Sequence, residues 1–92
     1  MQFEWDKNKE RRNLLKHGLD FDPVNMLFSS NMHVYEDTRK DYGEKRYIGL
    51  GLYLTRCLCV IYTKRGDAFR IISLRKANER ETEEYYKKLR EN

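Results

Sequence analysis

A chain of 92 residues has room for one compact domain, residues 1–92, and too few residues for two separate cores. Charged residues reach 37% and the net charge is +4, which favours an anionic partner, while 13% aromatic content and regularly spaced apolar residues argue against disorder. No apolar run approaches the roughly 18 residues of a membrane span, and the acidic N-terminus does not suit a signal peptide, so we expect a cytoplasmic protein without a membrane partner.

The first part of the chain predicts a short strand followed by a helix. Residues 1–5 alternate between apolar and polar side chains, as the residues of a strand do. Asp6 can cap a helix over residues 7–17, and Gly18 supplies the left-handed residue that ends it. This helix is rich in Lys and Arg, and a charge run of this kind is more often a solvated face than a binding surface.

A second short helix and two strands are expected next. Asp22 is predicted to cap this helix, with Pro23 in its first position. Residues 32–36 form a weak strand candidate, and residues 37–44 are polar and contain glycine, which predicts a loop of the kind that often contacts ligands. Residues 45–53 then form a strand whose two glycines indicate a bulge or close packing by a neighbour.

The stretch from Cys57 to Ala77 predicts a β-hairpin. Two apolar runs, residues 57–62 and 68–74, are joined by the polar residues 64–67. Because side chains alternate between the faces of a strand, the second run should sort its residues into two sets. These sets are Phe69, Ile71, Ser73 and Arg75 on one face, and Arg70, Ile72, Leu74 and Lys76 on the other.

The spacing of Asn78 and Glu81 is that of a capping box, so we predict a last helix that runs to the end of the chain. The element order is then β-α-α-β-β-β-β-α. Strands that are linked by short turns form an antiparallel sheet, and helices packed on such a sheet make an α+β fold.

Metal and cofactor chemistry have no support in the sequence. Cys57 and Cys59 lie too close along one strand for a disulfide, so we interpret them as buried, reduced thiols. His17 and His33 have no spacing that joins them to this pair as zinc ligands. There is no Walker loop and no dinucleotide fingerprint. We therefore expect neither a metal site nor a cofactor.

The side chains that remain for chemistry are basic and aromatic. RNA cleavage without a metal needs a base for the ribose 2′-hydroxyl, cations around the phosphorane and an acid for the leaving 5′-oxygen. Arginine binds phosphate oxygens bidentately, and tyrosine rings can stack on unpaired bases. His17 is placed at a helix C-terminus, which favours its charged form and a capping role, and Tyr62 can equally be a half-buried strand residue.

Five separated motifs resemble one family, and together they cover nearly the whole chain: FEWD, NLLKHG, RYIGLG, VIYTKRGD and RIISLRKANERE. In order and spacing they resemble the BrnT toxins of bacterial type II toxin-antitoxin systems. The resemblance implies a RelE-like toxin fold and a metal-independent ribonuclease that blocks translation. It also implies a BrnA-type antitoxin with a ribbon-helix-helix domain, so that operator DNA is bound only through the antitoxin in an autorepressing complex.

The resemblance also yields the candidate site. We assign Arg65, Arg70 and Arg75 to phosphate binding or phosphorane stabilisation. His17 or Tyr62 is assigned to proton transfer. The further RNA contacts are expected at Lys9, Arg46, Ser73 and Lys76. Three other matching positions have structural readings: Trp5 as core, Asp6 as a helix cap and Glu81 as half of a capping box.

A second hypothesis belongs to a different class. The sequence contains no confident general base, so the basic sheet could serve only to dock an antitoxin or a nucleic acid. Such a binding module would show salt-sensitive binding without RNA turnover. Acidic antitoxin segments could neutralise the same surface, so RNA and antitoxin are expected to compete.

Overall fold

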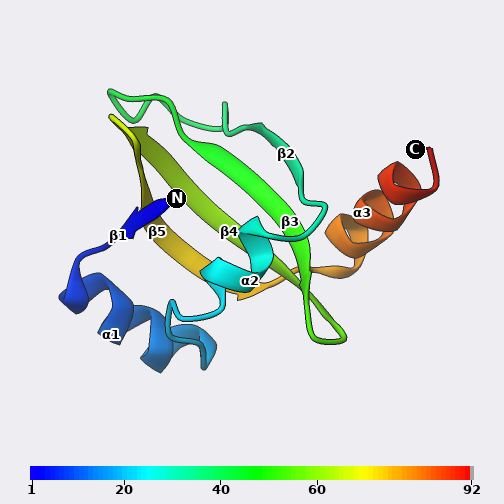
Figure 1. Ribbon diagram of the computed structural model, residues 1–92, viewed down its shortest axis with the longest axis horizontal. Helices are drawn as coiled ribbons and strands as arrows, with labels where there is room; N and C mark the ends of the chain where they lie inside the picture. Colours follow the sequence, from blue (N-terminus) through cyan, green and yellow to red (C-terminus); the bar gives the residue numbers. More distant parts are fainter. Residues whose placement is uncertain (92) are drawn as a thin grey trace.

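The computed structural model describes residues 1–91, and these form three helices and five strands in the predicted order (Figure 1). The elements are β1 (Gln2–Glu4), α1 (Lys7–His17), α2 (Val24–Phe28), β2 (His33–Glu36), β3 (Tyr47–Tyr53), β4 (Arg56–Arg65), β5 (Ala68–Lys76) and α3 (Glu79–Glu91). The prediction that the last helix continues to the chain end concerns Asn92, which lies outside the described residues. No helix of residues 1–91 is both long and apolar enough to cross a bilayer.

The five strands form one sheet in the order β1-β5-β4-β3-β2. The three pairs from β2 to β5 are antiparallel, and short turns join β3 to β4 and β4 to β5. In contrast, β1 lies parallel to β5, with Phe3 opposite Phe69. The prediction of a purely antiparallel sheet is therefore wrong. No hairpin joins β1 to β5, so turn chemistry does not set the direction in which β1 pairs.

The predicted ends of α1 and the predicted start of α3 are confirmed. Asp6 Oδ1 accepts a hydrogen bond from the Asn8 backbone N at 2.7 Å, and Gly18 ends α1 with a φ of 73°. Before α3, the backbone N of Asn78 donates to Glu81 Oε1, and the backbone N of Glu81 donates to Asn78 Oδ1, both at 2.8 Å. This exchange is the predicted capping box.

The predicted cap of α2 is wrong. The N-cap residue is Pro23, which provides no side-chain hydrogen bond, and the helix begins one residue later than expected. The backbone N of Asp22 instead donates to Asp20 Oδ1 at 3.1 Å. Asp20 therefore orders this turn through a local side-chain to backbone bond, which competes with the capping pattern.

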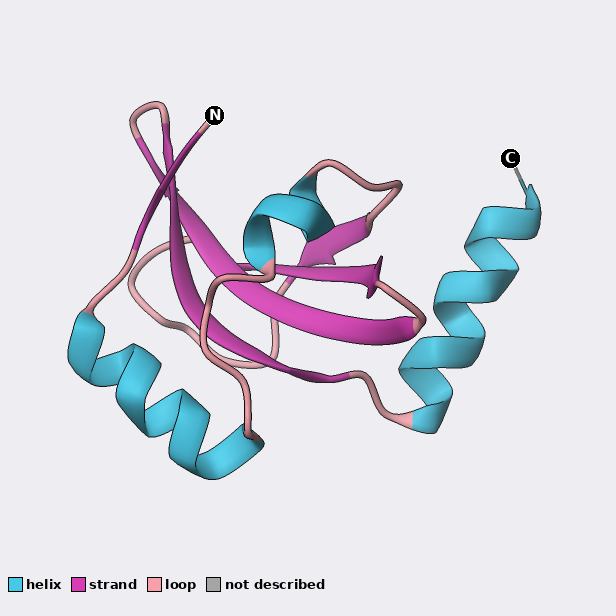
Figure 2. Ribbon diagram, turned by 60° about the horizontal axis from the view of Figure 1, so that its bottom comes forward, coloured by secondary structure: helices cyan, strands magenta, loops and turns pink. Residues whose placement is uncertain are grey.

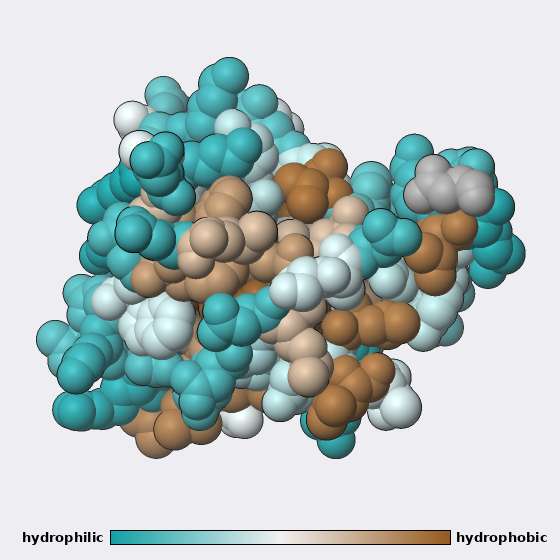
Figure 3. Space-filling view, in the orientation of Figure 1, coloured by the Kyte–Doolittle hydropathy of each residue, from teal (hydrophilic) through white to brown (hydrophobic). Residues whose placement is uncertain are grey.

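α2 packs on one face of the sheet, above β3 and β4 (Figures 1 and 2). The core on this side contains Phe21, Val24, Leu27, Leu58, Val60, Tyr62, Ile71 and Leu74. Figure 3 shows this face, with apolar residues in its middle and hydrophilic ones around them. A Cβ at Gly51 would lie 3.2 Å from Leu27 Cδ2, so the glycine permits the close packing that the sequence indicated.

α3 packs on the opposite face of the sheet, at the end where it contacts β2 and β3 (Figure 2). Tyr85 is the anchor of this helix and is buried at 3% exposure. It packs with Ile48, Leu50, Cys59 and Ile61. The rest of this face, toward α1 and the loop before β3, is left for the candidate site.

β5 contains a bulge that changes which face its side chains occupy. Two neighbouring residues of β4 pair with Ile71 and Ser73, so Ile72 has no partner there. Ile71 and Leu74 both enter the core beside α2, whereas Ile72 packs toward the α3 side. Ser73 and Arg75 therefore lie on the α3 side as well. The predicted alternation is correct up to Ile72 and wrong beyond it. Because of the extra residue, each side chain from Ser73 onward lies on the face opposite to the one predicted.

The side chain of Asn13 fixes α1 to β5 just after this bulge. Its Nδ2 donates to the Leu74 carbonyl at 2.7 Å and to the Leu19 carbonyl at 2.8 Å, and its Oδ1 accepts from the Leu74 N at 3.1 Å. β1 pairs only with residues 68–70 of β5, so the buried amide of Asn13 takes the place of a strand partner at Leu74. His17, four residues along α1, is thereby held near the bulge.

Replacing Asn13 with alanine should lower the free energy of unfolding by about 2–6 kcal/mol, because two buried backbone groups of Leu74 lose their partner at about 1–3 kcal/mol each. Urea unfolding followed by circular dichroism measures this change. Asn8→Ala, at an exposed position of the same helix, is the control and should stay within about 0.5 kcal/mol of the parent. Equal losses for the two variants would contradict the role given to Asn13.

Candidate active site

A hollow of about 290 Å³ opens on the α3 side of the sheet, between the end of α1, the loop before β3 and the strands β4 and β5. We call it the basic hollow. Its polar lining comprises Lys16 and His17 from α1, Asp37, Arg39, Tyr42 and Arg46 from the loop, and Ser73 and Arg75 from β5. The bulge is needed for this arrangement, since it turns the two β5 residues toward His17.

A second hollow of about 340 Å³ adjoins the first along α1. The two share Lys16, His17, Ile72 and Ser73, and the second adds Lys9 and Arg12. Five residues that the sequence singled out line one or both hollows: Lys9, His17, Arg46, Ser73 and Arg75. The fold thus brings together residues that are up to 66 positions apart in the chain.

Tyr62 lies on the other face of the sheet, away from the basic hollow. It is 4% exposed and belongs to the core beside α2, where its ring centroid is 5.0 Å from that of Phe28. Burial raises the pKa of its hydroxyl above 10.0. The structure therefore places Tyr62 as a core aromatic, the alternative that the sequence left open.

Three predicted cations are also outside the two hollows. Arg65 is exposed at the β4–β5 turn, where Nη2 lies 3.8 Å from Glu44 Oε1. Nη1 of Arg70 lies 3.6 Å from Glu4 Oε2, across the pair of β5 with β1. Lys76 is exposed at the far end of β5. These residues are not gathered with His17.

Arg75 is held by a buried carboxylate. Nη1 and Nη2 donate to the two carboxylate oxygens of Glu81 at 2.8 and 2.9 Å, and Nη1 also donates to the Lys76 carbonyl at 3.2 Å. These hydrogen bonds raise the pKa of Arg75 and lower the pKa of Glu81. Of five guanidinium N–H groups, two remain for a ligand.

The loop side of the hollow is organised by Asp37, which is 4% exposed. Its carboxylate accepts bonds from Arg39 Nε and Nη2, both at 2.8 Å, and from the Tyr42 hydroxyl at 3.1 Å. The Tyr42 ring in turn lies under the Arg46 guanidinium, whose Cζ is 4.1 Å from the ring centroid. Sequence reasoning missed this group, and its only signal was a polar loop expected to contact ligands.

Arg46 contains a buried N–H group without a hydrogen-bond partner among residues 1–91. Its Nε is buried and has no hydrogen-bond partner within the described residues, and Glu44 Oε2 lies 3.5 Å away. A buried N–H without a partner is uncommon, and it marks a position where an added acceptor is favourable. The Arg46 side chain also lines the basic hollow, to which it adds positive charge.

His17 is half-buried at the end of α1, where it lines both hollows. Its pKa is lowered below 6.5, first by burial and then by the charges of Lys16 and Arg75. This direction is opposite to the expected preference for the charged form. At neutral pH the imidazole is therefore mostly uncharged and able to accept a proton.

One group of three carboxylates could be considered for a metal among residues 1–91. The oxygens of Glu10, Asp20 and Asp22 lie within 4.8 Å of one another, but none of the three lines the basic hollow. Glu10 already accepts hydrogen bonds from Trp5 Nε1 and from the Phe21 backbone N, both at 3.0 Å. We interpret Glu10 as the anchor of the chain that follows α1.

The two thiols are free, as the sequence indicated. Cys59 is buried, and Cys57 is half-buried. Burial raises the pKa of Cys59 to about 12, so its thiol stays protonated at neutral pH. A protonated, buried thiol is a core residue and has no nucleophilic role.

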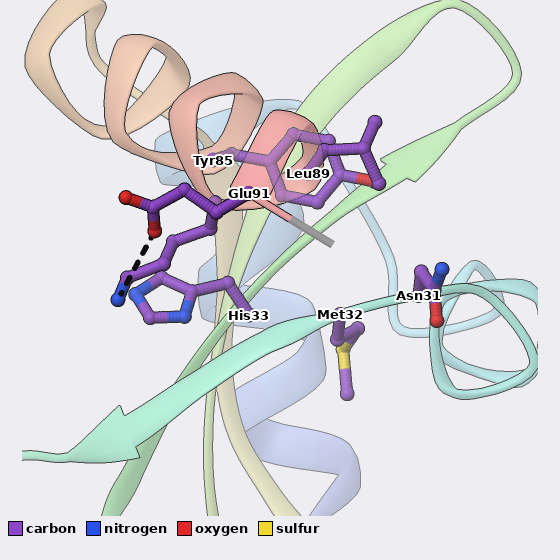
Figure 4. A pocket seen from close by; sticks show the side chains of 7 residues that line it. Asn31, Met32, His33, Tyr85, Leu89 and Glu91 are labelled. Atoms are coloured by element: carbon purple, nitrogen blue, oxygen red, sulfur yellow. Dashed lines mark ion pairs between the residues drawn. The ribbon is translucent and has the colours of Figure 1, made fainter.

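A further hollow of about 270 Å³ lies between β2 and α3 (Figure 4). Tyr85 and Leu89 line it from the helix and Met32 from the chain before β2. Its one ammonium group, on Lys88, is 3.7 Å from Glu91 Oε1. This hollow contains no arginine, so the basic hollow is the better candidate for an anionic substrate.

Residues 5–81 match the family model of BrnT, the ribonuclease toxin of type II toxin-antitoxin systems. The chain belongs to the BrnT toxin family. The resemblance found in the sequence is thereby confirmed, and a toxin of this type has a protein antitoxin as its partner. All residues of the basic hollow fall within the matched segment, whereas most of α3 lies beyond it. No curated protein matches this BrnT chain.

The buried Asp37 makes the stability of this BrnT protein sensitive to acid. Hydrogen bonds from Arg39 lower the pKa of Asp37 from 3.8 to about 2, so its contribution of about 2 kcal/mol is complete above pH 4 and is lost as the pH falls through about 2. Asp37→Asn should unfold at lower urea than the parent at pH 6. The gap between the two should narrow near pH 2.

Asp67→Asn is the matched control, because it removes an exposed carboxylate from the β4–β5 turn. Its free energy of unfolding should stay within about 0.5 kcal/mol of the parent at pH 6. A gap between Asp37→Asn and the parent that is equally wide at pH 6 and near pH 2 would contradict the low pKa of Asp37.

Proposed function

We propose that this BrnT protein is a metal-independent endoribonuclease whose active site is the basic hollow. One observation supports this most strongly: a half-buried His17 with a lowered pKa lines the same hollow as Arg46 and Arg75. A neutral base beside fixed cations meets the needs of RNA transesterification. The single domain of residues 1–92 would then hold all the groups for the reaction, in a RelE-like α+β fold.

In the proposed reaction, His17 takes the proton of a ribose 2′-hydroxyl. The 2′-oxygen then forms a bond to the adjacent phosphorus, and the bond from phosphorus to the 5′-oxygen breaks. The leaving 5′-oxygen takes a proton from solvent, to which the hollow is open. The products are a 2′,3′-cyclic phosphate and a 5′-hydroxyl end.

The cations stabilise the charge that develops on the phosphorane. Arg75 keeps two N–H groups beyond its bonds to Glu81 and to the Lys76 carbonyl, and the Arg46 guanidinium lines the same hollow. Fixed donors of this kind are worth about 10²- to 10³-fold in rate each. Because these side chains supply positive charge at the site, the reaction does not call for a metal ion.

The adjoining hollow would hold the phosphates that flank the cleaved bond. Lys9 and Arg12 line it from α1, and Ser73 belongs to both hollows. Cleavage inside an RNA chain needs a surface for the strand on either side of the reacting phosphate, and the joined hollows provide one. RNA binding at this surface should weaken with salt.

The cellular role follows from the family. We propose that RNA cleavage stops translation in the cytoplasm and that a BrnA-type antitoxin neutralises the toxin in a hetero-oligomer. Acidic segments of such an antitoxin would complement the basic hollow and compete with RNA. Operator DNA would be bound by the antitoxin, and the complex would repress its own operon.

His17→Ala should lower RNA cleavage about 10²- to 10⁴-fold, because the general base is lost. Arg75→Lys should lower it about 10²-fold, since an ammonium can still pair with Glu81 but the guanidinium fork is gone. Purified toxin without antitoxin is incubated in EDTA with total RNA and with translating ribosomes. The RNA ends are then sequenced.

Arg56→Ala is the control, since Arg56 is exposed at the β3–β4 turn and outside both hollows, and it should cleave RNA like the parent. Arg65→Ala tests whether the active site is instead at the β4–β5 turn, because Arg65 lies there and outside both hollows. Loss of cleavage in Arg65→Ala with full activity in His17→Ala would overturn the proposed site. Salt-sensitive RNA binding by the parent without any turnover would favour the binding module.

The pH dependence of cleavage should report the pKa of His17. Because the lowered pKa is caused by burial and by nearby positive charges, Lys16→Gln should raise it and move the acidic limb of the rate profile to higher pH. Single-turnover rates between pH 5 and 8 would measure the limb. An acidic limb that moves to lower pH in Lys16→Gln would contradict His17 as the base.

A further inference from the structure

The loop side of the basic hollow contains an arginine whose direction is fixed by a buried carboxylate. Asp37 accepts four hydrogen bonds, three of them from Arg39: from Nε and Nη2 at 2.8 Å and from the backbone N at 3.2 Å. Its side chain is 1% exposed, whereas the Arg39 side chain is 61% exposed. The carboxylate is thus inside the protein, and the guanidinium lies at the surface of the hollow.

This pair repeats the arrangement on the sheet side of the hollow. Arg75 there is held by two hydrogen bonds to Glu81, which is 6% exposed. In both pairs the arginine lines the basic hollow, and the carboxylate takes one edge of the guanidinium. The other N–H groups then keep a fixed direction for a second acceptor.

We propose that Arg39 contacts an RNA phosphate from the loop side of the basic hollow and that Asp37 is its positioning residue. The inference rests on the proposed ribonuclease function and adds a phosphate contact that the sequence did not indicate. Phosphate oxygens accept bidentate bonds from guanidinium groups, and forks fixed on two sides of a hollow select a phosphodiester by shape as well as by charge.

Asp37 acts on more than one lining residue. Its carboxylate also accepts the Tyr42 hydroxyl at 3.1 Å, and the Tyr42 ring supports the Arg46 guanidinium at 4.1 Å. One buried charge therefore orders the loop side chains before RNA arrives. Ordering them in advance spares the entropy that free arginines would lose on binding.

The contact is tested with a fluorescent, non-cleavable 2′-O-methyl RNA of mixed sequence, titrated with the full chain in EDTA at several KCl concentrations. Arg39→Ala should weaken binding about 10-fold and reduce the slope of log affinity against log salt by about 1, because one phosphate contact is lost. Lys40→Ala removes the same charge from the neighbouring exposed position. Its affinity should stay within about twofold of the parent.

The positioning role is tested with Asp37→Asn. If only the electrostatic field mattered, removal of a negative charge beside the hollow would tighten RNA binding. If Asp37 positions Arg39, binding weakens, by about 10-fold, although the net charge becomes more positive. In an Arg39→Ala background, Asp37→Asn should then cause a clearly smaller loss, namely the part that acts through Tyr42 and Arg46, and this double-mutant cycle separates positioning from a general loss of structure.

Circular dichroism at the assay temperature establishes that every variant is folded. No RNA binding by the parent would overturn both this inference and the proposed function. Reduced cleavage in Arg75→Lys together with equal RNA affinities for Arg39→Ala and Lys40→Ala would overturn the inference alone. Tighter binding by Asp37→Asn, or the same loss with and without Arg39, would overturn the positioning role.

Discussion

The bulge at Ile72 decides which side chains the basic hollow receives. With strict alternation, Ser73 and Arg75 would point into the apolar core beneath α2, where an arginine would be buried without an acid partner. The extra residue turns both to the other face. Asn13 then binds the backbone of β5 immediately after the bulge, which sets the end of α1 beside these side chains. An imidazole from a helix and a guanidinium from a strand line the same hollow because of one unpaired residue.

Two buried carboxylates give the basic hollow its order. Glu81 closes the capping box of α3 and binds Arg75 at the same time, so the start of a helix and the direction of a site arginine depend on one side chain. In the loop before β3, Asp37 likewise binds an arginine, Arg39, and a second loop side chain, Tyr42. Each carboxylate keeps its charge at neutral pH because arginine hydrogen bonds lower its pKa. Two arginine side chains of the basic hollow are thereby held in fixed orientations.

Most features that depend on neighbouring residues could be predicted from the sequence, although the cap of α2 was not, and those that depend on distant contacts could not. Caps at Asp6 and Asn78 follow from local spacing and were found as expected. The parallel pairing of β1 and the bulge in β5 have no local signal, because neither needs a special residue. Tyr62 was ambiguous for the same reason. Alternation along a strand sorts the side chains into two faces, but it does not show which face packs against the core. The fixed direction of Arg39 was missed because it depends on the burial of Asp37.

The two edge strands of the sheet, β1 and β2, are short. β1 contains three residues and β2 contains four. Beyond β1, the amide group of Asn13 occupies the hydrogen-bonding positions of β5 that another strand would use. Short edges of this kind offer a poor template for a strand from a second molecule. The side chain that ties α1 to β5 therefore also covers part of a sheet edge in the folded protein.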